Sequence, residues 1–396
     1  MLVLFSCGKS TEPQGGSASG MLPPPSTTVW VKRFGDRNVQ GIDALALDSA
    51  GGVVAGGYAC GTVDFGGGPQ TVVGNCGLFV ARFSPDGRAQ WVRVDGVAGI
   101  QSSVNVAYVL PTGNVLVAGH LGRAMFVDEL DSNGAVVTKL RHGDPMGGDG
   151  YASVRALTMI GADRVVAGDA SKRVDLGMGT IEHIGVFPFV ARYSPDGTAR
   201  WVQVLDAKYK AGADAIATLP DGNVAVCGET DAPEFGAFVT VLDGSTGQPR
   251  WSKLDGDSCN ALAVLGDTLV AGGVVSSGTI VAAYSSTGEL RWKLPSSNGF
   301  VPTALSVVDD QLLIVGRALG DEHQLLRLDR VGKVLASKTM SGKFELHAMA
   351  ANNDGIVVGG QLEGHTDLGT GTDVATVKAP ADAPTNLDAL LGRIRM

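Results

Sequence analysis

Short apolar runs separated by polar turns recur along almost the whole chain. The stretch "LFVARFSPDGRAQWVRV" begins at Leu78 and returns as "PFVARYSPDGTARWVQV" from Pro188. Each copy holds an apolar run, a polar turn with one late glycine, and a second run, which predicts two antiparallel strands joined by a hairpin. A glycine at the end of such a turn supplies the positive φ that closes it.

Weaker copies of this hairpin begin at Met125, Ala237, Thr279 and Gln324. In four of the six copies a tryptophan follows the turn glycine by four residues, at Trp91, Trp201, Trp251 and Trp292. A different hairpin precedes each copy, and its clearest examples are "VNVAYVLPTGNVLVAGH" and "ADAIATLPDGNVAVCGE". The two hairpins together predict a unit of four antiparallel strands, a to d, with a period of about 40–50 residues, as in propeller blades.

Seven first hairpins occur, but the seventh second hairpin is divided between the chain ends. "ALLGRIRM" at the C-terminus matches strand c, and "TTVWVKRFG" near the N-terminus matches strand d and carries Trp30. We therefore predict an all-β, seven-bladed β-propeller with four antiparallel strands per blade. Its ring is closed by the N-terminal strand d, Thr28–Gly35, pairing with the C-terminal strand c, Ala389–Arg395, which protects an open edge.

These units resemble the repeats of bacterial seven-bladed β-propeller proteins that are exported, many of them as lipoproteins. The segment Val63–Trp91 carries the resemblance most strongly, and the likeness extends over residues 27–396. It implies a fold and export from the cytoplasm. It implies no particular activity, because propellers host many functions.

The N-terminal segment predicts a membrane tether. Leu4–Cys7 resembles a lipobox, so residues 1–7 are interpreted as the remnant of a lipoprotein signal with Cys7 as the lipidated residue. Residues 8–26 are rich in Gly, Ser and Pro, as in a flexible linker, and residues 27–396 form the propeller. Only residues 1–3 precede this box, fewer than the apolar region of a secretory signal, about 7–15 residues, so a truncated or plainly cleaved leader is the alternative. We expect an exported protein of the bacterial cell envelope, anchored to the outer membrane through its N-terminal lipid only.

Composition and cysteine placement narrow the partners and the compartment. The formal net charge of −9 argues against nucleic acid, which requires a basic surface. Cys60 and Cys76 flank the first long b–c connection, and we predict a disulfide between them, allowed in an oxidising compartment. For Cys227 and Cys259, the sequence leaves a bridge and two buried thiols equally open.

The predicted strand order places the b–c and d–a loops on one face. Three b–c connections are long, and each contains Asp-(Phe/Leu)-Gly-x-Gly, at Asp64, Asp175 and Asp367. Long loops on a rigid scaffold often carry function. The simpler interpretation of each aspartate is an Asx-type turn, since no calcium-loop spacing is complete.

Strand a supplies a second set of candidates on that face, where each blade has one polar residue near the start of the strand. We call these seven the polar ring: Asp43, Asn105, Arg155, Asp214, Asn260, Thr303 and His347. Either they bond loops and channel water, or they line a ligand funnel of mixed charge. Four arginines recur on strand c and are interpreted as blade packing: Arg82, Arg192, Arg327 and Arg393.

The sequence favours a binding role over catalysis. The six histidines form no metal-ligand pair, and no Gly-x-Ser-x-Gly motif occurs, so we expect no cofactor and no metal. The leading hypothesis is a monomeric, non-enzymatic scaffold that binds a protein or glycan through the b–c loop face, most strongly where the seventh and first blades meet. Two alternatives remain. One is an exported lyase or hydrolase using Asp43, Arg155, Asp214 and His347, and the other is a subunit of an envelope assembly machine.

Overall fold

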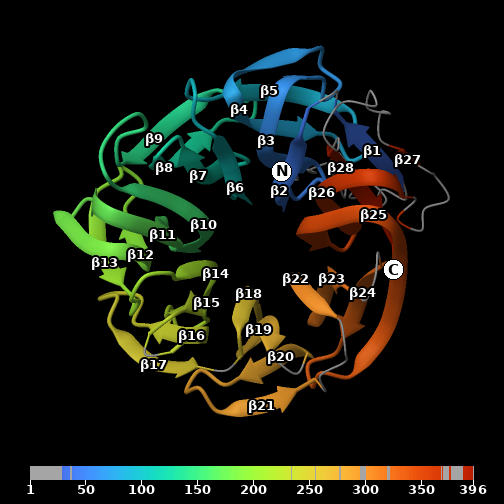
Figure 1. Ribbon diagram of the computed structural model, residues 1–396. Coiled ribbons are helices and arrows are strands. Elements are labelled where there is room, and N and C mark those ends of the chain that lie inside the picture. Colours follow the sequence, from blue (N-terminus) through green and yellow to red (C-terminus); the bar gives the residue numbers. More distant parts are fainter. Residues whose placement is uncertain are drawn as a thin grey trace, which may run out of the picture.

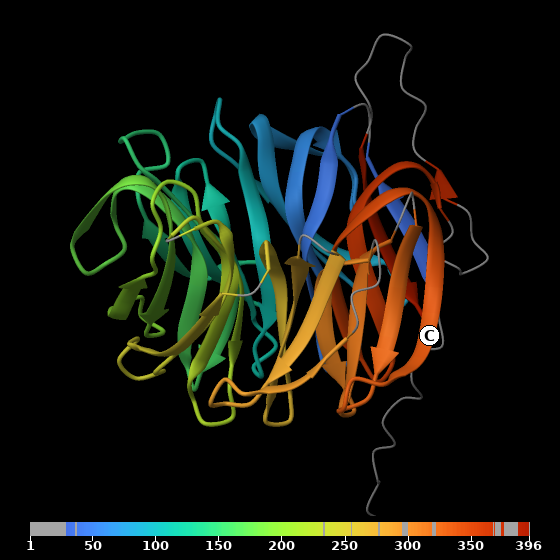
Figure 2. The same cartoon turned by 60° about the horizontal axis from the view of Figure 1, so that its bottom comes forward.

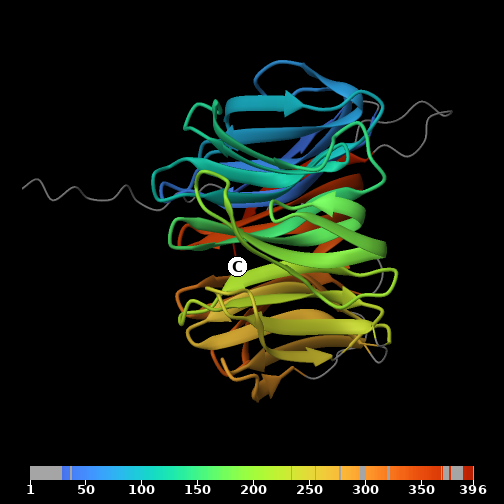
Figure 3. The same cartoon turned by 90° about the vertical axis from the view of Figure 1, so that its left-hand side faces the viewer.

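The computed structural model describes residues 29–35, 38–232, 234–254, 256–275, 278–294, 300–318, 322–366, 368, 374–375 and 387–395. Within these residues all regular structure is β-strand. Figure 1 shows antiparallel sheets set side by side around a central axis, following one another in sequence order. Figures 2 and 3 show the strands running between two faces on which the connecting loops gather. The fold is a β-propeller, as the repeats predict.

Five sheets have four strands each, in sequence order from the axis outward. The first holds β2 (Gln40–Leu47), β3 (Val53–Val63), β4 (Gln70–Phe83) and β5 (Ala89–Asp95). The second holds β6 (Ser102–Val109), β7 (Val115–Leu121), β8 (Ala124–Leu130) and β9 (Val136–His142). The third holds β10 (Tyr151–Ile160), β11 (Asp163–Asp175), β12 (Thr180–Tyr193) and β13 (Ala199–Val204). The fourth holds β14 (Gly212–Thr218), β15 (Val224–Thr230), β16 (Gly236–Leu242) and β17 (Pro249–Leu254). The fifth holds β18 (Ser258–Leu265), β19 (Thr268–Val275), β20 (Gly278–Tyr284) and β21 (Leu290–Lys293).

The remaining strands form one eight-stranded sheet. Its members are β22 (Val301–Val308), β23 (Gln311–Arg317), β24 (Glu322–Leu328), β25 (Val334–Asn352), β26 (Gly355–Thr366), β27 (Val374–Ala375), β28 (Asp388–Ile394) and β1 (Trp30–Phe34). The 19-residue β25 pairs with β24 through its first part and with β26 from Gly342 onward. Two four-stranded units therefore share this strand. The first strand of the chain pairs with the last, with Trp30 opposite Arg393 and Phe34 opposite Ala389.

The core lies between neighbouring sheets. One cluster joins Leu116 of the second sheet to Phe187 and Phe189 of the third. Another joins Phe34 and Leu391 of the eight-stranded sheet to Phe79 of the first. Each sheet therefore buries both faces against its neighbours, which explains why the middle strands are apolar at nearly every position.

All five tryptophans occupy outermost strands and make the same contact with the next sheet. Each indole N–H donates to a main-chain oxygen in a turn of that sheet, at Pro85, Ser132, Gly244, Ser286 and Arg330, over 2.8–3.1 Å. The closing glycine of that turn lies against the ring, so that a Cβ at Gly247 would be 2.7 Å from Trp201. The turn glycine therefore provides both the positive φ and room for the indole.

We expect Gly247→Ala to lower the free energy of unfolding by more than Gly222→Ala does. Both glycines have positive φ, 74° and 81°, so both variants carry the backbone cost of a left-handed alanine, about 1 kcal/mol. Only Gly247 also faces an indole, whereas nothing lies within 4 Å of a Cβ at Gly222. Urea unfolding of the two variants measures the difference, and equal losses would show that the indole contact has no importance.

Candidate functional site

Every residue of the polar ring lies at a β-bulge in its innermost strand. The pairing with the second strand shifts register across Asp43, Asn105, Arg155, Asp214, Asn260, Thr303 and His347. A bulge removes one residue from the ladder and re-aims its side chain. Among the described residues, one repeated backbone irregularity thus presents seven polar side chains near one end of the innermost strands.

A glycine on the second strand makes each bulge possible. A Cβ at Gly57 would lie 2.0 Å from the carbonyl oxygen of Gly41, and one at Gly168 would lie 1.9 Å from that of Ser153. The corresponding glycines of the other units are Gly119, Gly228, Gly273, Gly316 and Gly360, with distances of 1.9–2.3 Å. Only glycine allows the bulged strand to approach this closely.

The sequence analysis missed a second set of polar residues beside the ring. The residue after each of these glycines is Tyr58, His120, Asp169, Glu229, Val274, Arg317 or Gln361, so six of the seven are polar. The repeated glycine near the end of strand b was the signal that would have located them. One of them, Asp169, bonds directly to the ring residue Arg155.

Asp43 and His347 form one of two contacts between titratable side chains at the ring. The His347 Nδ1 lies 2.9 Å from Asp43 Oδ1, and its Nε2 lies 3.6 Å from Glu345 Oε2. Burial alone would lower the pKa of His347, but the hydrogen bond to Asp43 and the charges of Asp43 and Glu345 outweigh it, so the pKa is raised. The pair joins β2 to β25 and so lies where the two chain ends meet.

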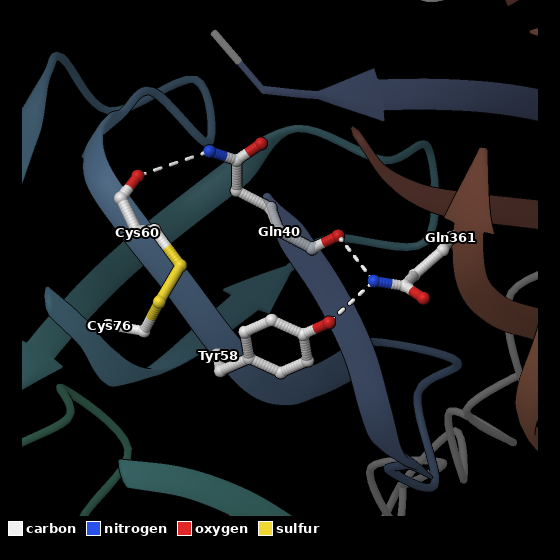
Figure 4. The surroundings of a disulfide bond; sticks show 5 residues. All are labelled: Gln40, Tyr58, Cys60, Cys76 and Gln361. Carbon is white, nitrogen blue, oxygen red and sulfur yellow. Dashed lines mark hydrogen bonds between the residues drawn. A yellow bond between two sulfur atoms is a disulfide. The ribbon is translucent and has the colours of Figure 1, made fainter. Parts of the chain in front are cut away.

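Figure 4 shows polar bonds around the Cys60–Cys76 disulfide. The Gln361 amide donates to the Tyr58 hydroxyl over 2.5 Å and to the Gln40 carbonyl over 3.3 Å, and Gln40 in turn donates to the Cys60 carbonyl. Burial raises the pKa of Tyr58, with the Asp43 charge adding to it. The first sheet and the chain ends are therefore linked by polar bonds that begin at the disulfide.

Arg155 is the centre of the second such contact. Its Nε donates to Asp169 and its Nη1 lies 3.3 Å from Asp214 Oδ1, while the Tyr151 hydroxyl donates to the other oxygen of Asp169. Burial raises the pKa of Asp214 to about 6, although Arg155 opposes the shift. Two ring residues, Arg155 and Asp214, are thereby brought together across neighbouring sheets.

The remaining ring residues bond to main chain. Asn105 donates to the Val154 carbonyl over 2.9 Å and Asn260 to the Pro302 carbonyl over 3.3 Å, each reaching the next innermost strand. Thr303 donates to the Val315 carbonyl over 3.2 Å within its own sheet. These three agree with the simpler interpretation of the ring as a set of structural bonds.

In two of the long b–c connections the aspartate forms a turn, and in the first the next residue, Phe65, is buried. Asp64 Oδ1 accepts hydrogen bonds from the amides of Gly66 and Gly68, and Asp175 accepts from Gly177 and Gly179, so both form Asx-type turns. Phe65 is buried against Phe79, with ring centroids 4.2 Å apart. Asp367 lies outside the described residues. Ligand contact by these aspartates stays a prediction.

Two disulfides join described cysteines. Cys60–Cys76 is confirmed and closes the base of the first long hairpin. Cys227 and Cys259, which the sequence left open, are also bridged, and they join β15 of the fourth sheet to β18 of the fifth. Cys7, the predicted lipidation site, lies outside the described residues.

Three of the four strand-c arginines, Arg82, Arg192 and Arg393, donate to carbonyls in turns of the next sheet. The Arg192 guanidinium donates to the Gly244 carbonyl over 2.7 Å, and the buried Arg393 donates to the carbonyls of Gly51 and Pro85. Arg82 is paired with Asp48 over 2.7 Å.

No group of three or more His, Cys, Asp or Glu residues in the described part of the chain is arranged to hold a metal ion. No helix in that part could span a membrane.

We expect His347→Gln to destabilise the protein most at low pH. Because the folded-state pKa of His347 is raised, its contribution is complete below the unfolded value of about 6.5 and is lost as the pH rises through the folded value. The matched control is His142→Gln, since burial lowers the pKa of His142 and reverses the sign. Urea unfolding from pH 5 to 9 should show the two differences changing in opposite directions. A His347→Gln difference that does not change with pH would contradict the pairing.

Comparison with a known structure supports the fold. A family model described as outer membrane protein assembly factor BamB matches residues 189–370, somewhat less than half of the chain. The chain is similar to a solved structure of streptogramin B lyase, with 12% identity and a TM-score of 0.52 over 92% of this chain and 98% of that one. It is also similar to a protein of unknown function from Bacteroides caccae, with 17% identity and a TM-score of 0.39 over 64% of this chain and 81% of that one. No curated protein matches it. At such identities the likeness concerns the fold alone.

Proposed function

We propose that this protein is an exported, seven-bladed β-propeller that acts as a non-enzymatic binding scaffold in the bacterial cell envelope. Its ligand-binding face is the one that carries the polar ring. The observation behind the proposal is that seven bulges, each with its own glycine, present polar side chains at the same strand position. A repeat that only needed to close would not require a polar residue at each bulge.

The strand pairing supports seven blades and a closed ring. Five four-stranded sheets and two units that share β25 make seven repeats, and the last unit is completed by β1 from the N-terminus. Sharing a blade between the two chain ends leaves no open sheet edge at the junction.

Two features support export. Disulfides persist in oxidising compartments, and the described residues hold two. The family description that matches residues 189–370 is that of an outer-membrane assembly factor. With the lipobox at Cys7 and the tether of residues 8–26, we place the protein at the outer membrane, held by a lipid and monomeric.

The ligand is a protein or a glycan of mixed polarity, because the ring combines Asp43 and Asp214 with Arg155 and His347. A pull-down from envelope extract with residues 27–396, paired with a glycan array, tests this. The double variant Asp43→Asn, His347→Gln should lose the captured ligand. If the variant still binds that ligand, the polar ring is not the binding site.

An exported enzyme is the second candidate, and one observation favours it. The Asp43 and His347 side chains form an acid–base pair within hydrogen-bond reach, and Asp214 has a pKa of about 6, which suits proton transfer near neutral pH. A lyase or hydrolase would release fragments from glycans retained on the array. Fragments formed by the wild-type protein but not by His347→Gln would replace the scaffold proposal with this one.

A third candidate is a subunit of an envelope assembly machine, favoured by the family match to residues 189–370. In that case the pull-down should recover outer-membrane proteins, and glycans should not bind.

A further inference from the structure

A cavity of about 430 Å³ lies between the second and third sheets, on the face of the polar ring. Its lining includes Arg123 from the β7–β8 turn, Asp149 and Tyr151 from the start of β10, and Asp169 and Lys172 from the end of β11. The volume is that of a site for a small molecule. The cavity includes the ring residue Arg155 and is distant in sequence from the Asp43–His347 pair.

The floor of this cavity is prearranged. Asp169 is only 2% exposed, yet it is a charged group, and both of its oxygens are engaged by the Tyr151 hydroxyl and the Arg155 Nε. Arg155 is also held by Asp214. Asp169 is buried and both of its oxygens are bonded, so this carboxylate presents a fixed surface to an incoming ligand, whereas the Arg155 side chain is half exposed.

A strained lysine lies at the mouth. Lys172 has a φ of 56°, a left-handed conformation that costs a residue with a side chain roughly 1–3 kcal/mol. The β11–β12 pairing shifts register between Ser171 and Arg173, so Lys172 is out of the ladder. Gly150 approaches the carbonyls of Ser171 and Arg173 so closely that a Cβ there would lie 2.2–2.6 Å away. Strained residues of this kind cluster at ligand sites, where the unusual backbone conformation sets the position of a side chain that contacts the ligand.

A second cation comes from the other sheet. The backbone of Arg123 is fixed, since its amide donates to the Pro145 carbonyl and its carbonyl accepts from the Ala152 amide. Its guanidinium makes one long bond, 3.4 Å, to the Gly148 carbonyl. Lys172 and Arg123 therefore line one cavity from two sheets, in a protein whose net charge is −9. The lining also holds two acids, Asp149 and Asp169, and both oxygens of Asp169 are already bonded to Tyr151 and Arg155.

We propose that this cavity binds a small carboxylate-bearing ligand of about the size of one sugar acid. Arg123 and Lys172 hold the carboxylate, because a guanidinium fork and an ammonium are the groups that bind it in proteins. Asp149 and the serine hydroxyls of the cavity, Ser153 and Ser171, accept and donate hydrogen bonds to ligand hydroxyls. The proposal rests on the binding role proposed above and places a subsite of the same face between the second and third sheets.

Calorimetric titration of the full-length protein with glucuronate, and with glucose as its uncharged counterpart, tests the proposal. We expect saturable glucuronate binding and at least tenfold weaker glucose binding, since loss of one charge-assisted pair changes affinity by roughly that factor. Lys172→Gly removes the cation and suits the left-handed backbone, so it should weaken glucuronate binding roughly tenfold without lowering the melting temperature. Arg123→Gln should weaken it to a similar extent.

The matched control is Arg173→Ala, which removes a neighbouring exposed cation that pairs with Glu182 outside the cavity. It should leave binding unchanged. Absence of glucuronate binding at millimolar concentration, equal binding of glucose, or equal loss in all three variants would each overturn the proposal. If the Asp43, His347 double variant loses its captured ligand while Lys172→Gly does not affect glucuronate, the scaffold role stands and this subsite does not.

Discussion

Deletion of residues 387–396 is expected to abolish cooperative folding or to lower the melting temperature by at least about 10 °C. The deletion removes β28, in which every residue is buried. Leu390, Leu391 and Ile394 are fully buried, and each contributes about 1.5–3 kcal/mol through burial, so the loss approaches the whole stability of a typical domain. It also removes the partner of β1 and leaves Trp30 on an unpaired edge.

Circular dichroism during thermal unfolding measures this effect. The control is removal of residues 1–26, which the sequence predicts to be a signal remnant followed by a tether, and this should leave the melting temperature unchanged. Leu391→Ala should fall between the two, with a loss of roughly 2–5 kcal/mol. A truncation that melts at the wild-type temperature would rule out closure of the ring by the two chain ends.

Gly57→Ala is expected to lower the free energy of unfolding by about 3 kcal/mol or more. Its Cβ would lie 2.0 Å from the carbonyl oxygen of Gly41, which is backbone and has no flexible end to move aside. The strand must then shift, and the bulge that aims Asp43 is lost with it. The variant should therefore also lose the pH dependence that His347 derives from Asp43.

The control for this variant is Gly67→Ala in the adjoining long hairpin. There a Cβ would make ordinary contact with Val92 at 3.7 Å, so its effect should stay within about 0.5 kcal/mol. Urea unfolding of both variants decides the matter. Equal, small losses would mean that the strand-b glycines do not shape the bulges.

The strands and their order were predictable because the hairpins repeat. Copies of one pattern reinforce each other, so weak examples such as that from Gln324 could be placed with strong ones such as that from Leu78. The single structural position of the five tryptophans followed in the same way. Burial of Phe65 could not be predicted, because a phenylalanine within a polar, glycine-rich loop gives no periodic signal.

The contacts within the polar ring could not be predicted from the sequence, for a different reason. A period of one blade places seven residues at equivalent positions, but which of them bond depends on the neighbours each blade supplies. Asp43 pairs with His347 across the chain ends, whereas Asn260, at the same position, bonds to a carbonyl. The bridge between Cys227 and Cys259 likewise depends on the approach of two sheets.

The central claim is that function lies on the face of the polar ring. The direct test compares ligand capture by residues 27–396 as the wild type, as Asp43→Asn with His347→Gln, and as Asp86→Ser with Asp196→Ser. The last pair lies in turns at the other end of the strands, where Ser84 and Ser194 donate to the two carboxylates. We expect the ring variant to bind the captured ligand roughly tenfold more weakly than the wild type, and the turn variant to bind it as the wild type does. Loss of binding in the turn variant, with full binding in the ring variant, would contradict it.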